Sequence, residues 1–101
     1  MPNLLNRLNF CTYVLLSLKD KEFYIGFTTN LEQRLTAHFC GENKSTAARR
    51  PLELIHCEYF LLRADAERRE KYFKTAKGKR TLRIMLKDIF AQIQQKALKF
   101  S

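Results

Sequence analysis

Five side chains in this sequence have the types needed to attack a phosphodiester. Tyr13 and Tyr24 come early in the chain, Arg34 and His38 follow at a spacing of four, and Glu70 comes much later. An arginine can contact two phosphate oxygens at once, and a carboxylate can hold a divalent cation. Tyrosine and histidine side chains can transfer a proton. The set therefore indicates phosphodiester chemistry, if the fold brings its members together.

The charge of the chain points to the same class of partner. The 101 residues include 19 Lys and Arg against 10 Asp and Glu, which gives a net charge of +9. A folded domain this basic favours a polyanion, and nucleic acid is the commonest one. A solvated surface is the alternative interpretation, although solubility requires a net charge of only about 2–8.

Length and composition predict a single domain over residues 10–101, preceded by a short lead at residues 1–9. The three cysteines, Cys11, Cys40 and Cys57, form neither a metal motif nor a disulfide framework, so we expect reduced thiols and a cytoplasmic protein. No apolar run approaches the ~20 residues of a membrane span.

The first structural unit that we expect is a β-hairpin. Residues 10–18 are rich in β-branched, aromatic and leucine residues on both faces, which predicts a central strand. Residues 19–22 form the turn and residues 23–27 return as the second strand. Residues 53–60 alternate as a third strand, which could join either edge of the pair. His56 on this strand is more simply an exposed or hydrogen-bonded residue than a ligand.

The register of the hairpin decides how far apart the two tyrosines lie. A four-residue loop pairs Ser17 with Tyr24 and leaves Tyr13 four positions along the strand, about 13 Å away at ~3.3 Å per residue. A bulge or a shifted register would change this separation, and the sequence leaves these alternatives open.

The helix that carries Arg34 and His38 has clear end signals. Thr29 and Glu32 fit a capping box, so the helix should run from about residue 30 to residue 40, with Gly41 as its stop. The arginine and the histidine share one face and flank an apolar stripe at the boundary between core and water. That stripe consists of Leu31, Leu35 and Phe39.

Two more helices are expected after the third strand. A charged helix over residues 64–75 has Asp65 as a candidate cap, and residues 77–80 break it. A final helix over residues 81–97 has an apolar face that we interpret as core packing, with a dimer seam as the alternative; its residues are Leu82, Met85, Leu86, Ile89, Phe90 and Ile93. The fold class is therefore α+β, in the order β-β-α-β-α-α, with a three-stranded sheet covered by helices.

The chain resembles the GIY-YIG nuclease superfamily and is similar to the nuclease module of an excinuclease. Five segments match in order at compatible spacing over about residues 10–90; they are Cys11–Tyr13, Tyr24–Gly26, Thr28–His38, Arg50–Leu54 and Ala66–Glu70. The first triplet departs from its namesake, because Cys11 and Thr12 stand where glycine and isoleucine would. The C-terminal asparagine of some members has no counterpart, since no asparagine follows Asn43.

The resemblance implies a small stand-alone, metal-dependent endonuclease that hydrolyses DNA phosphodiester bonds, structure-directed and acting in DNA repair or processing. It implies Mg²⁺ or Mn²⁺ held by Glu70, with Tyr13 as general base. Arg34 would contact the phosphate, Tyr24 would hydrogen-bond the phosphate or the water, and His38 would relay the proton. Eight further basic residues are expected to hold the DNA backbone, namely Lys44, Arg49, Arg50, Lys71, Lys74, Lys77, Lys79 and Arg80.

Other interpretations of the sequence remain open at this point. The alternative function is a nucleic-acid-binding module that uses the same basic surface without cutting. We expect a monomer, and a protein partner that supplies targeting is possible because no appended specificity domain is visible.

Overall fold

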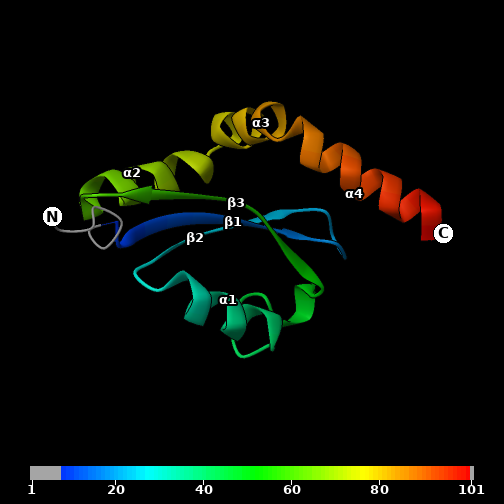
Figure 1. The fold of residues 1–101 in the computed structure, drawn as a ribbon, viewed down its shortest axis with the longest axis horizontal. Coiled ribbons are helices and arrows are strands. Elements are labelled where there is room, and N and C mark those ends of the chain that lie inside the picture. Colours follow the sequence, from blue (N-terminus) through cyan, green and yellow to red (C-terminus); the bar gives the residue numbers. More distant parts are fainter. Residues whose placement is uncertain (1–7, 101) are drawn as a thin grey trace, which may run out of the picture.

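The computed structural model describes the backbone of residues 8–100 and the side chains of residues 8–96. Most of the expected lead at residues 1–9 therefore lies outside the described residues. Three strands form one sheet, with helices on both sides of it (Figure 1). The elements are β1 (Phe10–Ser17), β2 (Phe23–Thr28), α1 (Leu31–Phe39), the short 3₁₀ helix η2 (Ala47–Arg49), β3 (Leu52–Phe60), α2 (Arg63–Phe73), α3 (Ala76–Met85) and α4 (Lys87–Phe100).

The sheet has the strand order β2-β1-β3, and both pairings are antiparallel. The α+β class, the hairpin and the central position of β1 are therefore confirmed. Seven of the eight residues of β1 are buried, as expected for a strand with neighbours on both sides and helices on both faces. The third strand joins the free edge of β1, which settles the alternative that the sequence left open.

The register of the hairpin differs from the expected one, in which Ser17 would pair with Tyr24. Tyr24 pairs with Leu15 and Tyr13 pairs with Gly26, so the two tyrosines are one pleat repeat apart on the same face. The pairing is shifted by two residues because the turn comprises residues 18–21, one residue earlier than the expected 19–22. Its closing hydrogen bond runs from the Ser17 amide to the Glu22 carbonyl, at 3.0 Å, and Lys21 has a positive φ of 64°.

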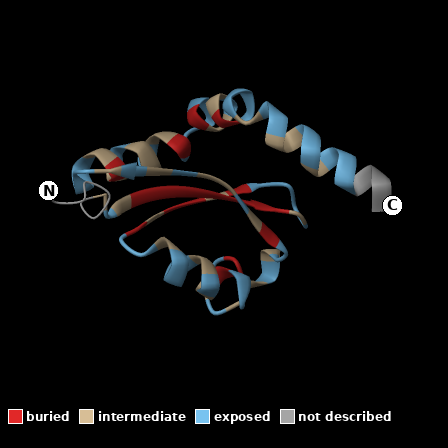
Figure 2. Ribbon diagram, viewed as in Figure 1, coloured by how far each residue is buried: buried red, intermediate tan, exposed pale blue. Residues whose placement is uncertain are grey.

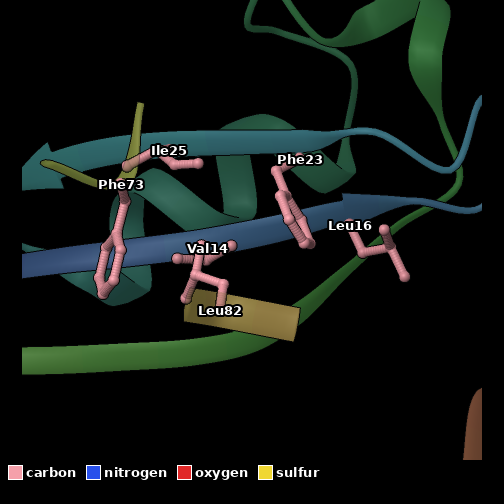
Figure 3. Close-up of a cluster of buried hydrophobic side chains, with 6 residues drawn as sticks. All are labelled: Val14, Leu16, Phe23, Ile25, Phe73 and Leu82. Atoms are coloured by element: carbon pink, nitrogen blue, oxygen red, sulfur yellow. The ribbon is translucent and has the colours of Figure 1, made fainter. Parts of the chain in front are cut away.

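Two hydrophobic clusters lie on opposite faces of the sheet. One contains Val14, Leu16, Phe23 and Ile25 of the hairpin with Phe73 of α2 and Leu82 of α3 (Figure 3). The other contains the intervening β1 residues, among them Tyr13 and Leu15, and packs against α1. The alternation of β1 thus supplies both cores, and the buried residues in Figure 2 are concentrated along this strand.

The start of α1 differs from the predicted capping box, whereas its end follows the prediction. Asn30 is the N-cap, because its side-chain oxygen accepts a hydrogen bond from the Gln33 amide. Thr29 was the wrong candidate. The end is a Schellman motif, in which Gly41 has a φ of 79° and the Glu42 amide donates to the Ala37 carbonyl. Of the predicted apolar stripe, Phe39 is 45% exposed and lies outside the core.

The helices after β3 are divided differently from the prediction. Leu62 rather than Asp65 occupies the N-cap of α2, and the break comes at residues 74–75 rather than 77–80. Thr75 begins α3 by accepting a hydrogen bond from the Gly78 amide. A Cβ at Gly78 would collide with the Tyr72 carbonyl, so this glycine permits the close approach of α3 to α2.

The predicted final helix is two helices, α3 and α4, which join near Leu86. Leu82 is fully buried, and Leu86, Phe90 and Ile93 pack partly against the same cluster. Met85 is 44% exposed, so part of the expected apolar face lies in solvent. Beyond this contact α4 projects from the body of the molecule (Figure 1). Among the described residues, no helix combines the length and the apolarity that crossing a bilayer requires.

Candidate active site

A pocket of about 300 Å³ opens beside β2 and contains four of the five predicted residues. Tyr13 and Tyr24 reach it from the hairpin, Arg34 from α1 and Glu70 from α2. The helices α1 and α2 cover opposite faces of the sheet, but β2 is an edge strand, so groups from both faces meet at this edge. The structure thus brings together side chains that are far apart in the sequence.

Gly26 makes room for the Tyr13 ring in this pocket. The two residues are directly opposite each other on β1 and β2, and a Cβ at Gly26 would overlap the ring and its hydroxyl. The absence of a side chain allows the phenol to lie across the neighbouring strand. The Tyr24 ring lies beside it, with the two ring centroids 6.3 Å apart. The position of the Tyr13 ring therefore requires a glycine at residue 26.

The fifth residue, His38, lies behind Tyr13 and is fully buried, which differs from its predicted place at the core–water boundary. Its Nε2 is 2.9 Å from Tyr13 Oη, and its Nδ1 is 2.7 Å from Thr46 Oγ1. The Tyr24 ring contacts the imidazole edge, at a centroid separation of 4.9 Å. Both ring nitrogens are thus hydrogen-bonded, and the imidazole is held between a tyrosine and a threonine.

Burial shifts the pKa values of the tyrosine and the histidine in opposite directions. Burial is the main reason that the pKa of Tyr13 is raised well above its usual range; Tyr24 and Glu70 raise it further, while Arg34 lowers it. Burial, and then the nearby Arg34 charge, lower the pKa of His38. At neutral pH the buried pair is therefore a neutral phenol and a neutral imidazole.

The carboxylate of Glu70 is the acidic group of the pocket, and its side chain is 21% exposed. One of its oxygens lies 3.2 Å from the ammonium of Lys74, one turn further along the chain. No cluster of three or more His, Cys, Asp or Glu side chains that could hold a metal occurs among the described residues. A single hard oxygen ligand suits Mg²⁺, which keeps several waters and also binds substrate phosphates.

The eight basic residues predicted to hold DNA occupy different environments. Lys74 and Lys79 line the pocket itself. Arg49 instead pairs with Asp20 at 2.8 Å and donates to the Phe23 carbonyl, so it joins η2 to the turn of the hairpin. Arg50 donates to the Ala47 carbonyl. The remaining four are exposed, namely Lys44, Lys71, Lys77 and Arg80.

Sequence reasoning missed the contribution of Thr46. This residue lies in the polar segment 41–50 and is fully buried, with its hydroxyl on His38 Nδ1. It lies eight positions after the histidine, and nothing in the local pattern distinguishes it from the neighbouring Ser45. A second unpredicted contact joins the Thr12 hydroxyl to the Ala66 carbonyl at 2.6 Å. This buried bond ties β1 to α2, the helix that carries Glu70.

Known protein sequences are similar to this chain over most of its length. The family model for the GIY-YIG catalytic domain matches residues 9–83. A UPF0213 protein of Staphylococcus haemolyticus is 38% identical over 68 residues, covering 66% of this chain and 83% of the relative. One from Enterococcus faecalis is 42% identical over 72 residues, covering 68% and 81%.

Among solved structures, a UPF0213 protein of Bacillus halodurans, determined by solution NMR, is similar at 29% identity. The match has a TM-score of 0.49 and covers 75% of this chain and 83% of that one. The family assignment is carried by the domain match, which spans most of the chain and includes the residues of the pocket. The chain belongs to the GIY-YIG nuclease superfamily.

Proposed function

We propose that the protein is a metal-dependent endonuclease that hydrolyses phosphodiester bonds of DNA, in repair or processing. The observation that carries this proposal is the pocket in which Tyr13, Tyr24, Arg34 and Glu70 meet. Hydrolysis of a phosphodiester needs an activated water and stabilisation of the negative charge that grows on the phosphate. The pocket offers a group for each requirement within a single small volume.

The proton path begins at Tyr13. In the tautomer protonated on Nδ1, His38 donates to Thr46 Oγ1 and accepts the Tyr13 hydroxyl proton at Nε2, over the observed 2.9 Å. Tyr13 then takes a proton from the attacking water as it passes its own proton to His38. This transfer avoids a free phenolate, which the raised pKa of Tyr13 disfavours. The neutral imidazole, which the lowered pKa of His38 favours, is the form able to accept the proton.

The remaining pocket residues would stabilise the negative charge of the phosphate. The Arg34 guanidinium can bind two nonbridging phosphate oxygens, and the Tyr24 hydroxyl can donate to a third oxygen or hold the water. Glu70 is the residue that would hold Mg²⁺ or Mn²⁺, which would supply Lewis-acid stabilisation of the phosphate when bound. Lys74, which now pairs with Glu70, would become available to the DNA backbone.

The test is cleavage of labelled branched and duplex DNA in Mg²⁺ or Mn²⁺. We expect Tyr13→Phe to lower the rate by about 10²–10⁴-fold, the usual contribution of a positioned acid or base. Glu70→Ala should remove metal-dependent product while DNA binding in EDTA persists. Glu67→Ala is the matched control, because Glu67 lies on the same helix and pairs with Arg63 outside the pocket.

Two outcomes would contradict the proposal. Cleavage by both pocket variants at the wild-type rate would assign the activity to another protein in the preparation. Salt-sensitive DNA binding by the wild type, with no product in either metal on any of the substrates, would instead identify a binding module.

A further inference from the structure

A second, larger cavity continues from the pocket and is the basis of a further inference, which rests on the proposed function. This flanking groove, of about 990 Å³, lies between the end of β2, the exposed side of α1, residues 42–43 and Arg63 at the start of α2. Phe27 and Arg34 line both cavities. A strand whose phosphate is held by Arg34 in the pocket would therefore place the next nucleotide in the groove.

The chemistry of the groove differs from that of a phosphate site. Its charged residues are Glu32 and Glu42 together with Arg34 and Arg63, so it is formally neutral in a chain of net charge +9. A phosphate in the groove would face two carboxylates. The other polar lining consists of amides and hydroxyls, including Gln33 and Asn43. Such groups recognise the edges of nucleobases.

The available hydrogen-bonding atoms support this assignment. Among the described residues, the side chains of Gln33, Glu32 and Glu42 make no hydrogen bond within the chain, so their polar ends are available to a ligand. Phe27, which lines both cavities, and Ala37 add apolar surface to the groove. The volume is at the upper end of the ~300–1,000 Å³ of small-molecule sites, which is ample for a nucleoside.

We propose that the flanking groove is a nucleoside subsite, which binds the unpaired base next to the scissile phosphate. Carboxylates accept hydrogen bonds and donate none, so the groove favours bases with an exocyclic amino group, and cytosine over thymine. A base that fills the groove between β2 and α1 must leave the helical stack, so the base must be unpaired when it binds. The substrate is then DNA with an unpaired nucleotide at the incision site.

The experiment measures binding to duplexes that carry a short bulge of cytidine, thymidine or abasic residues, by fluorescence anisotropy in EDTA. The three bulges share shape and phosphates, so only the base differs. We expect the wild type to bind the cytidine bulge about fivefold more tightly than the abasic bulge, the lower end for a base-edge contact. The thymidine bulge should fall between them.

Two variants and their matched controls locate the contact. Gln33→Ala and Glu42→Ala should bring the ratio of cytidine to abasic affinity close to one. Gln92→Ala on α4 and Glu22→Ala in the hairpin turn remove the same groups from exposed positions outside the groove, and should keep the ratio. The ratio cancels the general gain in DNA affinity that follows when a negative charge is removed.

Equal binding of the cytidine and abasic bulges by the wild type would overturn the subsite. Loss of the ratio in the control variants would overturn it as well. The assay contains no divalent metal, so it does not depend on cleavage: a protein that cuts DNA but shows no base-dependent ratio keeps the proposed function and loses the subsite. Absence of binding to every bulge would remove both.

Discussion

The hydroxyl of Thr46 allows the arrangement around His38 to be tested by a change of one atom. Thr46→Val replaces that hydroxyl by a methyl group of similar size. Both side chains are fully buried and their hydrogen bond is 2.7 Å long, so the variant leaves His38 Nδ1 without a partner and away from water. A buried polar group left unsatisfied costs about 1–3 kcal/mol. A domain of this size has a total stability of about 5–15 kcal/mol, so the loss is large enough to measure.

The assay is equilibrium unfolding in urea, with the midpoint and the slope fitted separately. We expect a lower midpoint at an unchanged slope, which reports stability rather than a change in compactness. Thr36→Val is the matched control, because Thr36 is an exposed threonine whose hydroxyl donates to the Glu32 carbonyl. Its effect should stay within about 0.5 kcal/mol. Equal stabilities for the two variants would refute the claim that Thr46 holds the imidazole.

Three further predictions follow from the geometry. The pKa of His38 is lowered in the folded state, so below the ordinary histidine pKa of about 6.5 the unfolded state binds more protons than the folded state. The free energy of unfolding should therefore fall as the pH drops below about 6.5. A His38→Gln variant should lose this pH dependence, as measured by urea titrations at several pH values. Gly26→Ala should destabilise the fold by about 1–3 kcal/mol and reduce cleavage, because its Cβ overlaps the Tyr13 ring; a wild-type midpoint would contradict this. Lys79→Ala should lower the salt dependence of DNA binding by about one phosphate contact, whereas Arg49→Ala should lower the thermal midpoint and leave that salt dependence unchanged.

The sequence was sufficient for the fold class because the patterns concerned are local and strong. Apolar residues on both faces of β1 placed this strand between two neighbours, and the apolar steps of α1 with Gly41 placed that helix and its end. The register of the hairpin was not predictable in the same way. It depends on how a connection closes, and the choice of Ser17 and Glu22 as the closing pair has no separate sequence signal.

Four of the five predicted site residues line the pocket, and the burial of the fifth, His38, was not predicted. The residue types and the family resemblance identified the four residues, Tyr13, Tyr24, Arg34 and Glu70, that meet in the pocket. Helical spacing placed His38 at a margin, because spacing reports a direction and not what covers that direction. Thr46 and Tyr13 hydrogen-bond the two ring nitrogens and the Tyr24 ring contacts the imidazole edge, and these are tertiary contacts without local periodicity.

The boundary between α2 and α3 illustrates a conflict between local and tertiary signals. Gly78 lies among lysines and an arginine and was predicted to break the helix. In the structure it is the point of contact between two helices, where a side chain would meet the Tyr72 carbonyl. Glycine costs a helix about 1 kcal/mol relative to alanine, and the close packing of α3 on α2 offsets this cost.

The position of the pocket at the β2 edge has a consequence for the newly made protein. Tyr13 and Tyr24 leave the ribosome early, whereas Glu70 is synthesised long afterwards, on a helix that packs against the other side of the sheet. A nascent or half-folded chain can therefore present the phenols without the carboxylate. Under the proposed function, completion of both layers would keep a partly assembled chain from cutting nucleic acid, since such a chain does not yet hold Glu70 beside the phenols.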